Sequence, residues 1–317
     1  MTTDSPTTGR PADAPAVSVR GLVKRFGGNT VLDGVDFDLQ PGVICGLFGR
    51  NGAGKTTLMS ILTAQGFASS GQVTVFGQAP YENSAVLPRM CFVRENQKYP
   101  DDARPQHAFE IARLFYPNWS DELAAQLADE FNLPMCTRIK KLSRGQLSAV
   151  GVIIGLASRA DITFFDEPYL GLDAVARQIF YDRLLADYAE HPRTVLLSSH
   201  LIDEIADIIE RVLVVDGGRI TVDADADDLR ERAFTVIGNE DAVNSFVAGR
   251  DELHRERMGP MASATVLGTL SGEDRTRIAD LGLSSGPVSL QELIVRLTQH
   301  NADGPLAAAA AEKGALR

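Results

Sequence analysis

Residues Gly49–Thr57, with the sequence GRNGAGKTT, have the composition of a loop that binds phosphate groups. The segment fits the pattern G-x-x-x-x-G-K-[ST] through Gly49, Gly54, Lys55 and Thr56. Glycines allow backbone N–H groups to turn inward around phosphate oxygens, and the start of a following helix adds a favourable dipole. We therefore expect Lys55 to reach the β- and γ-phosphates of a nucleotide and the Thr56 hydroxyl to ligate Mg²⁺. The nucleotide-binding residues expected in this segment are Gly49, Asn51, Gly52, Ala53, Gly54, Lys55, Thr56 and Thr57.

Two carboxylates, Asp166 and Glu167, follow the apolar run ITFF and supply the rest of a hydrolytic site. A strand that ends in Asp places its carboxylate at the carboxyl edge of a parallel sheet, where such sheets bind ligands. Asp166 would hold Mg²⁺, usually through water, and Glu167 would polarise the attacking water. An acidic pair after a strand is common and on its own indicates no function. Together with a phosphate loop in the same chain, it indicates a site that hydrolyses a nucleotide.

The segment KLSRGQLS, residues 141–148, supplies a second helix start that favours anions. Ser143 stands where an N-cap residue would, ahead of a helix whose first N–H groups have no partner within the helix. A capped helix in which Gly145 is merely tolerated is the plainer interpretation. It leaves unexplained why this helix start lies just before the strand that ends in Asp166. Because the phosphates already have one cradle in the same chain, this one could serve a nucleotide held by another subunit.

A sheet and helices must position these residues, and the sequence supplies both in alternation. Residues 17–26 and 31–40 alternate like strands, and the apolar run 43–48 leads into the phosphate loop as a buried strand would. Helical spacing follows Lys55. Further apolar runs and helical patterns alternate after it, with strands expected over 161–167, 194–200 and 211–220 and helices over 173–190 and 201–210. This alternation predicts a parallel sheet with right-handed crossovers.

Helical patterns dominate residues 105–133 and 146–157, and composition shifts mark the ends of the chain. The acidic segment 223–232 is predicted to be a connection, followed by strands over 233–238 and 264–270 and an amphipathic helix over 288–300. The expected organisation is a disordered tail (1–16), a main α/β domain (17–222) with a helical subdomain at about 98–157, an accessory α+β domain (223–300), and a second disordered tail (301–317).

The bulk properties are those of a globular protein without a nucleic-acid partner. The 317 residues include 31 basic and 42 acidic side chains, for a net charge of −11, and no large basic block. The longest apolar run, residues 149–157, is far shorter than the roughly 20 residues of a membrane span. Three separated cysteines, Cys45, Cys91 and Cys136, indicate reduced thiols in a cytosolic protein, and each is expected to be a small buried residue.

In the order of its motifs, the chain resembles the nucleotide-binding subunit of ATP-binding cassette (ABC) transporters over roughly residues 17–221. The resemblance implies an α/β P-loop ATPase fold with a mostly parallel central sheet, an antiparallel β subdomain and a helical subdomain, here with a small α+β appendage. It implies ATP and Mg²⁺ as ligands. It also implies two copies paired head to tail, so that Ser143 and Gly145 of one contact the γ-phosphate bound by Lys55 of the other.

The same resemblance assigns roles residue by residue. They are the phosphate loop Gly49–Thr57, the signature Leu142–Gln146 with Ser143, Arg144, Gly145 and Gln146 facing ATP, the strand Ile162–Asp166, the catalytic Glu167, the D-loop Asp173, the γ-phosphate sensor His200, and Phe26 stacking on adenine. Phe26 could equally be a core residue. The features GLD (residues 171–173), YPNW around Trp119 and a single nucleotide-binding domain resemble exporters with separate, multi-span ABC-2-type membrane subunits. The expected location is the cytoplasmic face of the plasma membrane, with residues 109–133 receiving the membrane partner.

Two positions depart from the family pattern. Arg144 stands where the commonest signature has glycine, and we expect activity to survive. The family usually has glutamine soon after a run like CFV, where this chain has Glu95, with Gln97 two residues later. A glutamate would add a negative charge beside the metal. The spacing favours Glu95 as the third Mg²⁺-associated residue beside Thr56 and Asp166, with Gln97 as the alternative.

Other functional classes stay open at this point. One is a non-transport ABC ATPase that acts on DNA or ribosomes, although the acidic balance and the lack of long coiled-coil inserts argue against it. Another is a regulatory ATP-binding module without turnover, against which Glu167 and His200 argue. The appendage after Val222 is compatible with a regulatory domain, a dimer contact or a simple extension. The sequence indicates no substrate and no transport direction.

Overall fold

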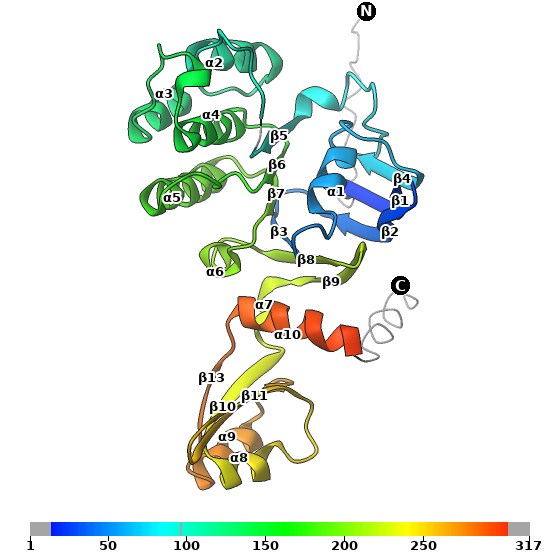
Figure 1. Ribbon diagram of the computed structural model, residues 1–317, viewed down its shortest axis with the longest axis vertical. Helices are drawn as coiled ribbons and strands as arrows, with labels where there is room; N and C mark the ends of the chain where they lie inside the picture. Colours follow the sequence, from blue (N-terminus) through cyan, green and yellow to red (C-terminus); the bar gives the residue numbers. More distant parts are fainter. Residues whose placement is uncertain (1–13, 96, 304–317) are drawn as a thin grey trace, which may run out of the picture. The chain divides into compact units, whose positions relative to one another are not determined.

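The computed structural model describes residues 14–95 and 97–303, and these fall into two compact units (Figure 1). The first unit comprises 14–45, Asn51–Ser198 and Gly217–Arg219. The second comprises Gly46–Arg50, Ser199–Asp216 and 220–303. The two predicted disordered tails fall mostly on 1–13 and 304–317, which lie outside the described residues.

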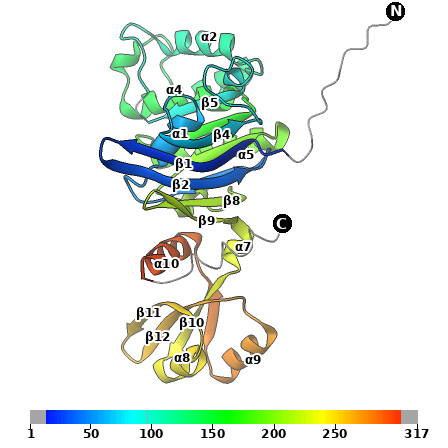
Figure 2. The ribbon, with the colours of Figure 1, turned by 90° about the vertical axis from the view of Figure 1, so that its right-hand side faces the viewer.

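An antiparallel sheet in the first unit forms around strand β1 (Val17–Phe26). Strand β2 (Asn29–Leu39) pairs with it from Leu39 opposite Val17 to Asn29 opposite Phe26, and β4 (Ser70–Val75) pairs on its other side. Figure 2 shows the three strands together. Alternate residues on β1 and β2 are fully buried, as expected for strands with one face on a core. The alternation predicted from the sequence is confirmed.

A parallel sheet holds the chemistry-bearing residues of the first unit. Its strands run in the order β5 (Met90–Arg94), β6 (Ile162–Asp166), β7 (Thr194–Ser198) and the beginning of β3 (Ile44–Phe48). The strands β5, β6 and β7 are parallel and in step, so that Arg94 lies opposite Asp166 and Asp166 opposite Ser198. All ten residues of β6 and β7 are buried, and six of them are apolar, which is typical of a sheet covered on both faces.

The helices of the first unit agree with the sequence prediction. They are α1 (Lys55–Leu62), α2 (Pro105–Phe115), α3 (Asp121–Glu130), α4 (Arg144–Ala157) and α5 (Ala174–Glu190), with short 3₁₀ turns at Leu87–Arg89 and Ile139–Lys141. Helices α2 and α3 pack against α4. Proline at the first position of α2 and Ser120 capping α3 mark where these helices begin.

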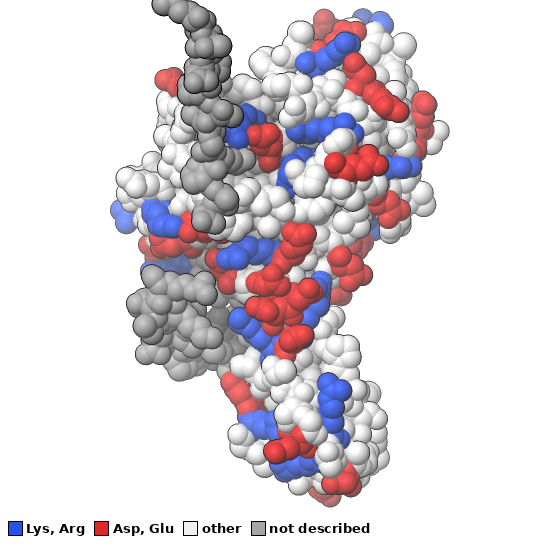
Figure 3. Space-filling view, turned by 180° about the vertical axis from the view of Figure 1, so that it is seen from behind, with Lys and Arg blue, Asp and Glu red and all other residues white. Residues whose placement is uncertain are grey.

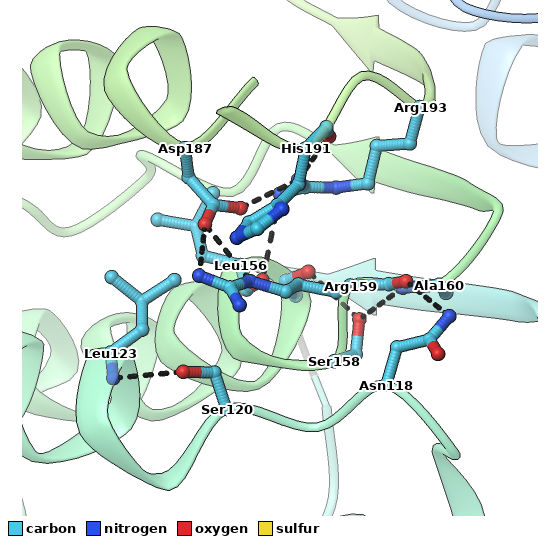
Figure 4. A network of polar contacts seen from close by, with 11 residues as sticks. Asn118, Ser120, Leu123, Leu156, Ser158, Arg159, Ala160, Asp187, His191 and Arg193 are labelled. Atoms are coloured by element: carbon cyan, nitrogen blue, oxygen red, sulfur yellow. Dashed lines mark hydrogen bonds and ion pairs between the residues drawn. The ribbon is translucent and has the colours of Figure 1, made fainter. Parts of the chain in front are cut away.

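A buried polar network joins α4, α5 and β7 at the edge of the sheet where the parallel strands begin (Figure 4). Asp187 on α5 accepts hydrogen bonds from Arg159 Nε at 3.0 Å and Nη2 at 2.8 Å, and from Arg193 Nη1 at 2.6 Å. The side chains of Asp187 and Arg193 are both only 4% exposed. A cleft of about 670 Å³ lies beside the network, with Gly42 and Glu190 also in its lining. Asp187 and Arg193 are therefore paired almost out of contact with water, whereas Arg159, whose side chain is 25% exposed, lies at the cleft.

The second unit contains a four-stranded antiparallel sheet in the order β11-β12-β10-β13. Its elements are α6 (Ile202–Ile205), β8 (Arg211–Asp216), β9 (Arg219–Asp225, from Ile220 on), α7 (Ala226–Arg230), β10 (Ala233–Asn239), α8 (Glu240–Val247), β11 (Glu252–Met258), β12 (Met261–Leu267), α9 (Gly272–Asp280), β13 (Ser284–Pro287) and α10 (Leu290–Asp303). Helices α8 and α9 lie beside this sheet (Figures 1 and 2). Phe234, Val243, Phe246, Ile278 and Leu283 share one buried cluster.

Several local expectations for the second unit were wrong. The helix expected over 201–210 is a single turn, α6, because residues 206–208 form a turn in which the Ile208 N–H bonds to the Ile205 carbonyl. The segment 223–232 is not a plain connection. It ends β9 and forms α7, which Asp225 caps through the amides of Asp227 and Asp228. Strand β12 lies three residues earlier than predicted, over Met261–Leu267.

Several elements were not predicted from the sequence, and the predicted burial of one cysteine was wrong. In the first unit the strands β4 and β5 were not predicted, and in the second unit most of β9, α8, β11, α9 and β13 were not. Cys45 and Cys91 are buried as expected, but Cys136 is exposed. It lies in the coil after α3, where the chain turns back toward α4 over the surface of the unit.

Candidate functional site

The phosphate loop leads directly into helix α1. Gly54 is the N-cap residue, with φ of 111°, and its carbonyl accepts the first helical hydrogen bond from Leu58 N at 2.8 Å. A Cβ atom at Gly54 would lie 2.7 Å from the Leu32 side chain and 3.1 Å from the Val31 carbonyl oxygen. Only glycine therefore fits this position, on both conformational and steric grounds. The loop from Asn51 onward belongs to the first unit, and Gly49 belongs to the second.

Lys55 is the most deeply buried charged group in this loop. Its side chain is 6% exposed, and its Nζ lies 3.8 Å from Glu167 Oε1. Burial lowers the pKa of the Lys55 ammonium below its ordinary value, while the carboxylates of Glu167 and Asp166 act in the opposite direction. Thr56, the next residue, is exposed and available to a ligand. The predicted phosphate-binding cation and the predicted water-polarising carboxylate are thus close together.

Ser198 at the end of β7 fixes both acidic residues. Its Oγ donates a hydrogen bond to Asp166 Oδ1 at 2.8 Å and accepts one from the backbone N–H of Glu167 at 3.0 Å. Glu167 has φ of 49°, a left-handed conformation that is uncommon for a residue with a side chain and that clusters at functional sites. Ser198 was not predicted from the sequence as a site residue. Its only signal was a hydroxyl residue at the end of the strand TVLLS.

The signature segment begins α4 with a capping box. Ser143 Oγ accepts a hydrogen bond from Gln146 N at 3.2 Å, and Gln146 Oε1 accepts one from Ser143 N at 3.0 Å. The predicted N-cap at Ser143 is confirmed. A Cβ atom at Gly145 would lie 2.7 Å from the Gly171 carbonyl oxygen, so this glycine allows α4 to approach the loop after Glu167 closely. Ser148 reinforces that approach by donating to the Leu170 carbonyl at 2.5 Å.

The two residues that depart from the family pattern contact each other. Arg144 Nη2 donates a hydrogen bond to Glu95 Oε1, and the two side chains form an ion pair. Glu95 lies just after β5, and Gln97 lies two residues on in the following coil. The structure thus places Glu95 next to the signature residue.

The remaining predicted residues lie at element ends. Phe26 ends β1 and is 57% exposed, which excludes the alternative that it is a core residue, and Lys24 Nζ lies 4.6 Å from the centre of its ring. Asp173 caps α5 by accepting a hydrogen bond from Ala176 N at 2.8 Å. His200 is exposed and belongs to the second unit. The roles of these three residues stay predictions.

The donor set fits a magnesium nucleotide better than a metal held by protein alone. In the part of the chain that the structure describes, no group of three or more His, Cys, Asp and Glu side chains is arranged to hold a metal ion. Asp166 and the Thr56 hydroxyl are oxygen ligands of the kind Mg²⁺ prefers, and Mg²⁺ usually completes its shell with water and substrate phosphates. No helix among residues 14–95 and 97–303 is long and apolar enough to cross a membrane.

Comparison with known sequences places residues 32–170 in a family described as "ABC transporter". The chain is 31% identical to the doxorubicin resistance ATP-binding protein DrrA of Mycobacterium tuberculosis over 70% of its own length and 69% of that protein. It is 27% identical to the daunorubicin/doxorubicin resistance ATP-binding protein DrrA of Streptomyces peucetius. That match covers 94% of this chain and 97% of the relative, so it continues past Val222.

Among solved structures, the fold resembles that of an ATP-binding subunit of an ABC transporter. The TM-score is 0.61 at 21% identity, over 68% of this chain and 92% of the other. At this identity the likeness concerns the fold alone. It agrees with the predicted P-loop ATPase fold and its mostly parallel sheet.

Proposed function

Because the chain belongs to the ABC transporter family as an ATP-binding subunit with ATPase activity, we propose that two copies pair head to tail around two ATP molecules. Hydrolysis reopens the pair, and this cycle drives export through separate membrane subunits. The observation that carries the proposal is the contact between Lys55 and Glu167 beside Asp166. It joins the group that would hold the γ-phosphate to the group that would polarise the attacking water.

Each residue of this cluster has a distinct task in the proposed reaction. Lys55 neutralises charge on the β- and γ-phosphates, and Glu167 orients the attacking water. Asp166, held by Ser198, would hold Mg²⁺ together with Thr56. When bound, the ion would neutralise developing charge on the phosphate oxygens. Glu167 has a left-handed backbone conformation, and its carboxylate lies 3.8 Å from Lys55 of the phosphate loop.

The pairing of two copies is supported by the exposure of the signature helix start. Ser143 and Arg144 are exposed, and the N–H groups of Arg144 and Gly145, which precede the capped N–H of Gln146, form a helix start that favours anions. We propose that Ser143, Arg144, Gly145 and Gln146 complete the nucleotide site of the second copy. His200 would sense the γ-phosphate, Asp173 would lie at the contact between copies, and Phe26 would stack on adenine.

The membrane partner would dock on the helical part of the first unit. Helix α2 exposes Ile111, Leu114 and Phe115, although its other face is buried against α4. Exposed apolar side chains grouped on one element are typical of an interaction surface. The docked subunit would hold this chain at the cytoplasmic face of the plasma membrane. The relatives named above are resistance ATP-binding proteins, which supports export as the direction.

We further propose that residues 17–222 form the ATPase domain and 223–300 an accessory domain. The antiparallel sheet and buried cluster of the second unit support a separate core for the accessory part. The rival function is a non-transport ABC ATPase acting on a soluble macromolecular partner. Co-purification from a membrane extract separates the two, because only the transport function predicts a multi-span membrane protein bound to this chain.

The first test removes the two groups that meet in the site. Lys55→Ala and Glu167→Gln should each lower ATP hydrolysis by about 10³-fold or more, as expected for residues acting on the transferred phosphate. Glu167→Gln should still bind ATP and accumulate as a dimer, seen as a doubled mass in light scattering. Glu273→Gln, the same change at an exposed position on α9, is the matched control. Undiminished turnover in Glu167→Gln would show that the catalytic assignment is wrong.

A further inference from the structure

The two departures from the family pattern form one structural feature. Arg144, in the signature, and Glu95, after β5, are 49 residues apart in sequence, yet their side chains form an ion pair. The Arg144 side chain is 67% exposed and that of Glu95 is 26% exposed, so both remain accessible from the solvent. A hydrogen bond between two charged groups is roughly twice as strong as one between neutral groups. The usual neutral residues at these positions would lack it.

The backbone around Arg144 also contacts the loop that follows Glu167. A Cβ atom at Gly171 would lie 2.8 Å from Arg144 Cγ, and the Gly171 backbone lies directly against Gly145. The aliphatic part of the Arg144 side chain therefore packs against the loop that contains Gly171. Its guanidinium group forms the ion pair with Glu95. The single side chain links the start of α4 to two segments that the nucleotide must engage.

The Arg144–Glu95 ion pair competes with the contact proposed between the signature and the γ-phosphate of the second copy. This step rests on the proposed head-to-tail pairing. In the paired state, the start of α4 faces the γ-phosphate of the nucleotide held by the second copy. Both that phosphate and the Glu95 carboxylate are anions, and both would draw on the same guanidinium, which stays charged at all relevant pH values. A carboxylate left beside a triphosphate would also repel it.

We propose that the Arg144–Glu95 ion pair is a latch within one chain, which is exchanged for a contact between Arg144 and the γ-phosphate of the partner's ATP. Glu95 holds the signature helix start in the nucleotide-free chain and raises the ATP concentration needed for pairing. Arg144 is the residue that changes partner. A dimer has two such latches, so the effect on pairing is the product of two exchanges.

The test measures pairing without turnover, in the full chain carrying Glu167→Gln. Adding Glu95→Gln should lower the ATP concentration for half-maximal dimer formation by about 1.5- to fivefold, since an exposed ion pair contributes modestly and the concentration, with two ATP per dimer, changes by the factor of one exchange. Adding Arg144→Gln should raise that concentration. In the Arg144→Gln background, Glu95→Gln should lower that concentration less than it does when Arg144 is present, because only the repulsion of the triphosphate remains to be removed; an equal effect in both backgrounds would refute the latch. Light scattering measures the average mass of each protein as the ATP concentration rises. The four proteins compared are the Glu167→Gln parent, the parent with Glu95→Gln, the parent with Arg144→Gln, and the parent with both.

A matched control breaks another partly exposed Arg–Glu pair of the same unit. Glu130 accepts two hydrogen bonds from Arg183, at 2.9 Å and 2.5 Å, between α3 and α5. Glu130→Gln should leave the ATP concentration for pairing unchanged. If it lowers that concentration as Glu95→Gln does, the effect is general to lost carboxylates and the latch is refuted.

Hydrogen exchange of the nucleotide-free chain provides a second readout that needs no dimer. Glu95→Gln and Arg144→Gln should each speed exchange of the hydrogen-bonded amides of residues 146–148 at the start of α4, and the double variant should exchange no faster than either. Equal exchange in all variants would refute the latch. If the Glu167→Gln parent forms no dimer at any ATP concentration, the proposed head-to-tail pairing is wrong. The rates of amide hydrogen exchange then test the Arg144–Glu95 latch on their own.

Discussion

At the scale of single residues, the state of Lys55 governs how the site responds to its ligand. The nucleotide-free chain keeps an ammonium almost out of contact with water, and burial lowers its pKa. The carboxylate of Glu167 offsets only part of that effect. Triphosphate would bring more negative charge to the ammonium and would raise its pKa. Binding is therefore linked to protonation of this one side chain.

This linkage predicts that ATP affinity falls at alkaline pH. The free chain loses the Lys55 proton at a pH below the ordinary lysine value, whereas the ATP-bound chain retains it to a higher pH. Between these two pKa values, affinity should fall by up to about tenfold per pH unit. Titration with ATP from neutral pH to about pH 10 measures the decline. Lys55→Arg, which stays protonated, should flatten the profile, and an equally steep profile in that variant would exclude Lys55 as the cause.

At the scale of secondary-structure elements, the polar network around Asp187 fixes how α4, α5 and β7 meet (Figure 4). One buried carboxylate balances two arginines, Arg159 and Arg193. Arg193 also donates to the His191 carbonyl at 3.2 Å. Asp187 and Arg193 are each only 4% exposed. The attraction between two such buried charges contributes less to stability than the loss of one partner would cost, because the other charge would be left buried and unpaired.

Removing that carboxylate should destabilise the chain strongly. Asp187→Ala would leave the buried Arg193 charge without its partner, and we expect the free energy of unfolding to fall by about 3–5 kcal/mol. Urea denaturation followed by circular dichroism measures it. Asp33→Ala breaks the exposed pair with Arg219 and should cost less than about 1 kcal/mol. Similar losses in the two variants would contradict the importance assigned to burial.

The elements that could be predicted are those whose local pattern agrees with their place in the fold. Ser143 was recognised as a cap because its residue type and the following helical pattern are local features. Strand β11 was missed because its sequence, ELHRERM, is mostly charged and shows no apolar pattern. Such a sequence is accommodated here because β11 is an edge strand of its sheet. Helix α8 spans eight residues, which are too few to show the repeat of apolar residues that identifies a helix in a sequence. Short elements of this kind depend on the sheet they cover.

The parts of the site that escaped prediction all depend on contacts distant in sequence. Ser198 acts through the register that puts it opposite Asp166 on a neighbouring strand. The Arg144–Glu95 ion pair likewise requires α4 to lie beside the end of β5. The phosphate loop, in contrast, has its whole chemistry within nine successive residues. Local motifs were therefore predicted, and the groups that orient them were not.

At the scale of the whole molecule, the C-terminal part has a core of its own. Its buried cluster extends from Phe234 to Leu283, and Phe246 in this cluster has no exposed surface. Arg250 and Arg277 lie over the Phe246 ring, at 4.5 Å and 5.7 Å from its centroid. A part of the chain with a separate core can lose stability without loss of the chemistry performed elsewhere.

Phe246→Ala tests this independence. Deletion of a fully buried phenylalanine typically costs about 3–5 kcal/mol, so the transition of the accessory part should move to lower temperature in calorimetry. The ATP affinity of the variant should match that of the parent chain. Exposed Met258 on β11 provides the control, because Met258→Ala should leave both quantities unchanged. A single transition that shifts as a whole would contradict a separate accessory domain.

The distribution of the three thiols makes the native chain suitable for site-specific fluorescence labelling. Cys45 and Cys91 are buried, and burial raises the pKa of the Cys91 thiol, which keeps it in its unreactive form. Cys136 is exposed, with only a 3.5 Å hydrogen bond to Gln106. A maleimide dye would therefore attach at one place without any substitution. That place lies between α3 and the signature helix, so the dye would report on nucleotide-driven movement there in real time.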